Sequence, residues 1–204
     1  MNKNLLALTV AASALAFSAS AATSNIVGYV KLALKKGNNL VSNPLNNTNT
    51  DGNKISSLFG SIDCSVLRWT GSGFNTTDTV AGAGVVSGDD FTLAPGEAVF
   101  VAVTADSSVT LVGEALTGTQ TVAIKKGNNF VASKIPLSGA ADTVLGLGID
   151  GSSVLTWNGN GYDSFDYVDG VGYLTGAPNI AVGQGIVVSA TTDATWSKTF
   201  TPAP

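Results

Sequence analysis

The stretch Lys35-Lys36-Gly37-Asn38-Asn39-Leu40-Val41-Ser42 decides how the chain is organised, because it occurs twice. It returns as Lys125-Lys126-Gly127-Asn128-Asn129-Phe130-Val131-Ala132. The first five residues, Lys-Lys-Gly-Asn-Asn, are identical in both places, and an apolar pair follows each time. In so short a chain this indicates common descent and not coincidence. The sequence therefore predicts a tandem duplication.

Further blocks follow in the same order in both copies. One is an aromatic residue, a turn rich in Gly, Ser and Asn, and a second aromatic residue; another has the spacing Asp-x-Val-x-Gly-x-Gly; the last is a turn before an apolar strand. The matching blocks are residues 69–74 with 157–162, 78–84 with 166–172, and 93–101 with 180–188. We expect two β repeats, at residues 22–116 and 117–204.

The fold class follows from the texture of each repeat. Short apolar or alternating segments are separated by Gly, Asn and Pro, and only 12% of the residues are charged. Such spacing predicts about seven strands per repeat. Residues 54–59 and 141–145 carry apolar side chains three and four apart, each before a Gly, which predicts one helical turn. We expect an all-β protein of two tandem antiparallel β-sandwich or barrel-like repeats, with one short helical turn in each.

The first 21 residues read as a secretory signal peptide. Lys3 precedes an apolar run from residue 5 to residue 17, and Ala19-Ser20-Ala21 has the form of a cleavage site. The run is too short to span a bilayer, so we expect no membrane span in the mature chain. The expected location is extracellular or on the cell surface of a bacterium, with the periplasm as an alternative.

Composition argues against several functions. The sequence holds no histidine, which excludes His-based triads and His-ligated zinc. With a net charge of −4 and no basic cluster beyond two Lys pairs, nucleic acid is not an expected partner. Cys64 is the single cysteine and is expected to be a small buried residue, with a disulfide between two molecules as the alternative. We expect neither an enzyme nor a bound cofactor.

The N-terminal strand suggests a way to assemble. Residues 27–32 resemble residues 112–116, which lie at the junction between the repeats. The simpler interpretation is that this strand pairs within the first repeat. The alternative is that it completes an open edge of the second repeat in a neighbouring subunit. The residues of this candidate assembly strand are Val27, Gly28, Tyr29, Val30 and Leu32.

Two features could bind a ligand. Trp69 and Phe74, with Trp157 and Tyr162, flank equivalent hairpin turns, where they either stack on a sugar or simply pack together. The aspartates of the second repeat, at positions 163, 166 and 169, offer a weaker alternative, a Ca²⁺ site, although the full Ca²⁺-loop pattern is missing. A glycan is thus an alternative partner.

The motifs together resemble a group of uncharacterised exported bacterial two-repeat β proteins. The likeness rests on Gly-Asn-Asn-Leu-Val-Ser-Asn-Pro-Leu (37–45), Trp-x-Gly-x-Gly-Phe (69–74) and Pro-Gly-Glu-Ala-Val-Phe-Val (95–101). It covers nearly the whole mature chain, and the second repeat departs from it at residues 134–136 and 182–184. The resemblance implies secretion and a β fold, and it implies no active site.

These observations lead to a functional expectation. The low charge, the apolar strands and the N-terminal strand favour a secreted structural protein that forms homo-oligomers or polymers, as the subunit of an extracellular filament or layer. The alternative is a β module that binds carbohydrate or a cell surface through the hairpin aromatics.

Overall fold

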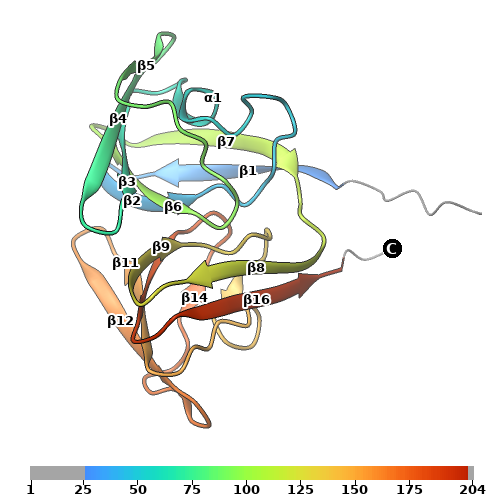
Figure 1. Ribbon diagram of the computed structural model, residues 1–204. Helices are drawn as coiled ribbons and strands as arrows, with labels where there is room; N and C mark the ends of the chain where they lie inside the picture. The colour runs from blue at the N-terminus through green and yellow to red at the C-terminus, as the bar shows by residue number, and fades with distance from the viewer. Residues whose placement is uncertain (1–25, 202–204) are drawn as a thin grey trace, which may run out of the picture.

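The computed structural model describes residues 26–201 and confirms an all-β, antiparallel fold with one short helix in that range (Figure 1). The expected signal peptide lies outside the described residues. The first half consists of β1 (Val27–Leu34), β2 (Gly37–Ser42), α1 (Ile55–Phe59), β3 (Cys64–Trp69), β4 (Phe74–Val80), β5 (Gly84–Ser87), β6 (Ala98–Val103) and β7 (Ser107–Glu114).

The second half repeats this order with small changes. It consists of β8 (Gly118–Ile124), β9 (Gly127–Val131), β10 (Gly139–Ala140), β11 (Ser152–Trp157), β12 (Tyr162–Val168), β13 (Gly172–Tyr173), β14 (Asn179–Ile180), β15 (Ile186–Ala190) and β16 (Ala194–Phe200). The extra pair, β10 with β14, has its counterpart in the first half as a single bridge between Lys54 and Thr92.

Each half contains a five-stranded sheet and a two-stranded ribbon. The sheets have the orders β2-β6-β3-β4-β5 and β9-β15-β11-β12-β13, which match strand for strand. The ribbons are β1-β7 and β8-β16. Every pairing is antiparallel, and no ladder joins a strand of one half to a strand of the other among the described residues. The two halves therefore share one topology.

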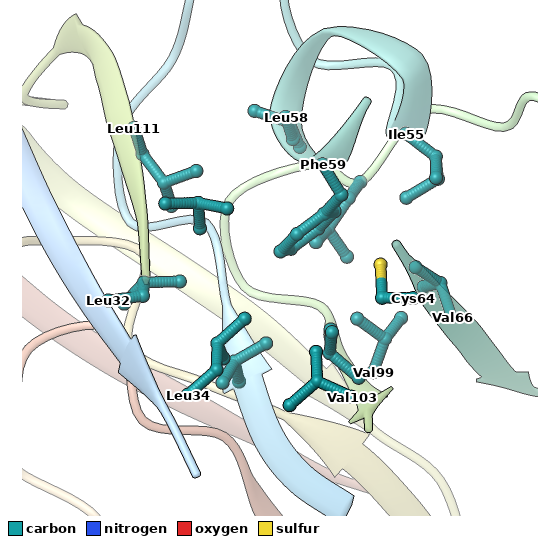
Figure 2. Packing of buried hydrophobic residues seen from close by; sticks show 14 residues of the cluster. Leu32, Leu34, Ile55, Leu58, Phe59, Cys64, Val66, Val99, Val103 and Leu111 are labelled. Atoms are coloured by element: carbon teal, nitrogen blue, oxygen red, sulfur yellow. The ribbon is translucent and has the colours of Figure 1, made fainter. Parts of the chain in front are cut away.

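Each ribbon packs on one face of its own sheet. In the first half, Leu34 of β1 and Leu111 of β7 lie against Phe59 of α1 and the valines of β6 (Figure 2). The second half builds the same core with Ile124 of β8 and Trp196 of β16. Burial of these side chains stabilises each half by about 25 cal/mol per Å² of apolar area removed from water.

Strands β6 and β15 are buried on both faces. Val99 and Val101 point into the core of the first half, whereas Phe100 between them belongs to a third cluster that also contains Val187 of β15. The alternation of side chains along a strand forces this division. Each sheet thus has its ribbon on one face and the sheet of the other half on the opposite face. This explains why β6 and β15 are apolar at nearly every position.

The second expected helical turn is not a helix. In the first half, α1 is anchored because the carboxylate of Asp90 accepts bonds from the backbone N–H and the hydroxyl of Ser56. At residues 141–145 the N–H of Leu145 donates five positions back to Ala140, and the N–H of Leu147 donates six positions back to Ala141. These residues therefore form a wide turn and not an α-helix, whose bonds run four positions back.

The first strand of the second half is β8, which takes the position that β1 has in the first half. Alignment of residues 27–32 with residues 112–116 is therefore not the structural one: β1 corresponds to β8, and β7 to β16. The apolar alternation of β1 is replaced in β8 by Thr119, Gln120 and Thr121, which hides the correspondence in the sequence. The simpler interpretation of the N-terminal strand, pairing within the first half, is what the structure shows.

Candidate functional site

The four predicted stacking aromatics meet at the interface between the halves. Trp69 and Phe74 lie 5.1 Å apart between ring centroids, and Trp157 and Tyr162 lie 5.2 Å apart. Phe100 contacts Phe74, Trp157 and Tyr162, with centroids 5.2–6.5 Å away. Their mutual packing occupies ring faces that a sugar would need.

Phe130 completes this aromatic cluster and was not predicted as part of a site. It contacts Trp69, Phe74 and Phe100 at 5.3–5.9 Å. Its counterpart in the first half is Leu40, and the exchange of Leu for Phe within the repeated block was the one sequence signal that could have revealed it. Phe74 and Tyr162 remain 41% and 40% exposed, so the cluster reaches the surface at both hairpins.

The two halves exchange polar contacts reciprocally. The indole Nε1 of Trp69 donates to the carbonyl of Asn128 at 3.1 Å, and Nε1 of Trp157 donates to the carbonyl of Asn38 at 2.8 Å. The backbone N–H of Ser42 donates to Gly183, and that of Ala132 donates to Gly96, in the same swapped pattern. The duplication is therefore arranged about an approximate two-fold axis.

The repeated lysine block folds into identical turns. Asp106 bridges the first turn: its carboxylate accepts from Lys35 Nζ and from the backbone N–H of Lys36, both at 2.9 Å. Asp193 does the same for Lys125 and Lys126 at 2.8 and 2.9 Å. These contacts raise the pKa of both bonded lysines and lower the pKa of both aspartates.

In each turn the side chain of one asparagine bonds to the backbone of the turn itself. Asn39 Oδ1 accepts from the N–H of Lys35, and its Nδ2 donates to three carbonyls, those of Lys35, Gly37 and Val101. Asn129 repeats every one of these bonds. The positive φ of +98° at Gly37 suits glycine, which explains the Gly that precedes the asparagines. The block is therefore repeated because it specifies a turn.

Two grooves flank the interface and are related by the same approximate symmetry. Groove 1, of about 610 Å³, runs between the Trp69 hairpin and the second lysine turn. Groove 2, of about 400 Å³, runs between the Trp157 hairpin and the first lysine turn. Several of their lining residues correspond, including Trp69 with Trp157 and Glu97 with Gln184. Each groove is built from both halves of the chain.

The candidate assembly strand, β1, pairs with β7 along all eight of its residues. Leu32 points into the core, Gly28 and Val30 are half-buried on the same side, and Val27 and Tyr29 point outward with exposures of 67% and 76%. Directly opposite Tyr29 lies Val112 of β7, which is 51% exposed. We call the outward surface formed by Val27, Tyr29 and Val112 the ribbon patch.

The equivalent surface of the second half is polar. Thr119 and Thr199 occupy the positions of Tyr29 and Val112, and they are paired in the same register. Their hydroxyls share a hydrogen bond of 2.8 Å. The backbone of the two ribbons is the same, so the apolar character of the ribbon patch is a property of its side chains and not of the fold.

Two of the three carboxylates considered for Ca²⁺, those of Asp163 and Asp166, serve as local hydrogen-bond acceptors. Asp163 accepts from Asn158, and Asp166 accepts from Ser153 across the β11–β12 pair. Asp169 uses its backbone N–H to bond the side chain of Asp150. Among residues 26–201 no three His, Cys, Asp or Glu side chains gather in a way that could hold a metal ion.

Cys64 and Glu97 are both held by contacts with neighbouring side chains. Cys64 is buried, and its Sγ lies 3.1 Å from the hydroxyl of Thr79. Burial, the main cause, raises the pKa of its thiol. Glu97 forms an ion pair of 2.9 Å with Arg68 and also accepts from the N–H of Ala94.

Comparison of the chain with known protein families, with curated proteins and with solved structures gave no match. In the described part of the chain, no helix has both the length and the apolar character that crossing a membrane requires.

Proposed function

We propose that the protein is an exported structural protein that associates with copies of itself, as a subunit of an extracellular filament or layer. The ribbon patch is the contact surface between copies. Export rests on the leader-like residues 1–21, and the role is one of shape and contact, with no reaction chemistry.

The observation that carries this proposal is the difference between the two ribbons. The same two-stranded ribbon occurs twice in the chain. Only the first copy exposes apolar side chains at these paired positions, Tyr29 opposite Val112. In the second copy, threonines stand at the same two positions and the strands pair in the same way, so the ribbon does not need apolar side chains there. A large exposed tyrosine beside two exposed valines is typical of a surface that another protein covers.

The second edge of β1 adds a further contact. β1 has a strand partner only on its β7 side within residues 26–201, so its other edge retains backbone groups that can pair with another strand. A self-complementary contact between the ribbon patches of two copies closes into a dimer. A second contact, through the free edge of β1, would let further copies add to that dimer. Donation of the whole strand would first have to break its eight pairings with β7.

The proposal is tested with variants that copy the second half onto the first. In Tyr29→Thr/Val112→Thr, and in the triple variant that adds Val27→Thr, the patch acquires the residues of the equivalent ribbon. Negative-stain imaging and size-exclusion chromatography of the mature wild-type chain should show assemblies that both variants lack. Val171→Thr/Leu174→Thr, which removes two exposed apolar residues at the β12–β13 hairpin, serves as the matched control and should assemble like wild type.

The outcomes separate the alternatives. Wild-type protein that is monomeric at every concentration would refute self-association. Assemblies that persist in the threonine variants would place the contact elsewhere, with strand donation as the first alternative. Export is tested separately by N-terminal sequencing of the secreted protein, where Ala22 is the expected first residue and an uncleaved Met1 would contradict it.

A further inference from the structure

We propose that the two grooves bind a linear acidic polysaccharide, one segment in each groove. The grooves lie at the end of each ribbon where β1 and β8 finish: the arrows of these two strands point the same way, and a lysine turn follows each (Figure 1). This inference does not depend on self-association.

Positive charge is concentrated in the grooves of an otherwise acidic chain. Of the ten Lys and Arg residues in the sequence, seven line the grooves. These are Arg68, Lys125, Lys126 and Lys134 in groove 1, and Lys31, Lys35 and Lys36 in groove 2. Groove 1 contains one lining carboxylate, Glu97, and groove 2 contains none. In a chain with a net charge of −4, this segregation makes both grooves attractive to anions.

Part of this charge is available to a ligand. Lys35 and Lys125 are already paired with aspartates, and Arg68 with Glu97. Lys31, Lys36, Lys126 and Lys134 form no ion pair among the described residues. The backbone N–H of Lys36, and likewise of Lys126, is held by an aspartate, which fixes the base of each side chain beside its groove.

The remaining groove lining suits sugar hydroxyls. Gln184 in groove 2 accepts from Ala181 through Oε1, which directs its amide donors away from that contact. Asn38 and Asn128 use their carbonyls to hold the tryptophans and keep exposed side-chain amides beside the grooves. Amides provide both donors and acceptors, as neutral hydroxyls require.

The arrangement favours a polysaccharide carboxylate over a nucleic acid. Phosphate recognition favours the bidentate fork of arginine, and the only arginine in the sequence, Arg68, is bonded to Glu97 and lies 4.8 Å from the Phe91 ring. Bases also need aromatic faces to stack on, whereas the indoles of Trp69 and Trp157 pack into the interface. Lysine point charges beside amides match carboxylates spaced along a chain of hydroxyl-bearing sugars.

The test is isothermal titration calorimetry of the mature chain with short oligogalacturonates. Binding should occur at two sites per chain and weaken as salt is added. Lys36→Gln and Lys126→Gln should each weaken binding at their own site about threefold, as loss of one exposed charge pair does. Lys54→Gln, a lysine outside both grooves, is the matched control and should bind like wild type.

Four results would overturn the inference: no heat of binding with oligogalacturonate; equal binding of a neutral cello-oligosaccharide of the same length; a loss in Lys54→Gln as large as in the groove variants; or tighter binding of single-stranded DNA than of oligogalacturonate. If the groove variants instead lose self-association while glycan binding is unchanged, the occupant is a second copy of this chain, and the glycan assignment is wrong.

Discussion

The indole Nε1 of Trp157 donates a 2.8 Å hydrogen bond to the backbone carbonyl of Asn38, a residue of the opposite half. Trp69 and Asn128 make the symmetry-related contact at 3.1 Å. Each repeat supplies one such Trp and one such Asn, and both hydrogen bonds run between the repeats and not within them. The two halves form one packed unit about an approximate two-fold axis, and the aromatic cluster lies at its centre.

The Trp157 contact can be tested by stability measurements. Trp157→Phe keeps an aromatic ring but removes the donor to Asn38, and it should lower the free energy of unfolding by about 1–2 kcal/mol. Chemical denaturation gives this value. Trp69→Phe should be destabilised by a similar amount. The indole of Trp196 bonds to the carbonyl of Leu145 within the second half, so Trp196→Phe should affect only the core of that half. A Trp157→Phe protein as stable as wild type would argue against a structural role for the bond.

Gly185 and Ala98 occupy equivalent positions and face each other across the interface. A Cβ on Gly185 would lie 2.7 Å from the Cβ of Ala98, so there is room for one methyl group and not for two. Gly185→Ala should destabilise the protein by about 1–3 kcal/mol. Adding Ala98→Gly should recover part of that loss, as a double-mutant cycle would measure. Strictly additive effects of the two substitutions would contradict this close approach.

Ser42 carries a buried hydroxyl that makes no hydrogen bond to any described group. The equivalent position in the second half is Ala132, which is equally buried. Ser42→Ala should raise the free energy of unfolding by about 1 kcal/mol, because it removes the cost of desolvating an unpaired hydroxyl. Ala132→Ser is the reverse control and should destabilise. A destabilised Ser42→Ala variant would show that the hydroxyl has a partner.

The lysine turns should make stability depend on pH. The pKa of Asp106 is lowered from its ordinary value of 3.8, first by the hydrogen bond from Lys35 and then by that from the Lys36 backbone. Its contribution is therefore present above pH 3.8 and is lost as the pH falls through the folded pKa. The pKa of Lys35 is raised from 10.5, so its contribution is present below that value and is lost as the pH rises through the folded pKa.

Thermal melting between neutral and acid pH tests this dependence. Asp106→Asn/Asp193→Asn should melt earlier than wild type at neutral pH. The difference should shrink as the pH falls from 3.8 through the lowered folded pKa, where the wild-type carboxylates also become neutral. Asp169→Asn removes a charge from a hairpin turn and is the control. A difference that stays constant through the acid range would contradict the assignment.

The sequence predicted the repeated architecture well because repetition is visible without a structure. The identical lysine blocks located both turns, and the Gly-rich hairpins located four strands. Strand β8 escaped because its Thr-Gln-Thr run lacks the apolar alternation of β1, and its place is set by pairing with β16. The helical turn expected at residues 141–145 failed because apolar spacing does not distinguish a helix from a turn in which Leu145 and Leu147 bond five and six positions back.

The candidate site was predicted only in part, for a physical reason. Trp69, Phe74, Trp157 and Tyr162 were recognised as equivalent aromatics, but nothing local in the sequence shows that the two sheets pack face to face. Asp106 and Asp193 also went unnoticed, although each stands just before the last strand of its half. Contacts between halves depend on the docking of whole sheets, and local pattern carries little information about docking.

The most direct measurement for the proposed self-association is sedimentation velocity of a transplant series. Tyr29→Thr/Val112→Thr should sediment as a monomer where the wild-type mature chain sediments as a larger species. Adding Thr119→Tyr/Thr199→Val to that variant moves the same side chains onto the second ribbon and should restore association. Sedimentation coefficients that are identical across wild type, variant and transplant would contradict the account.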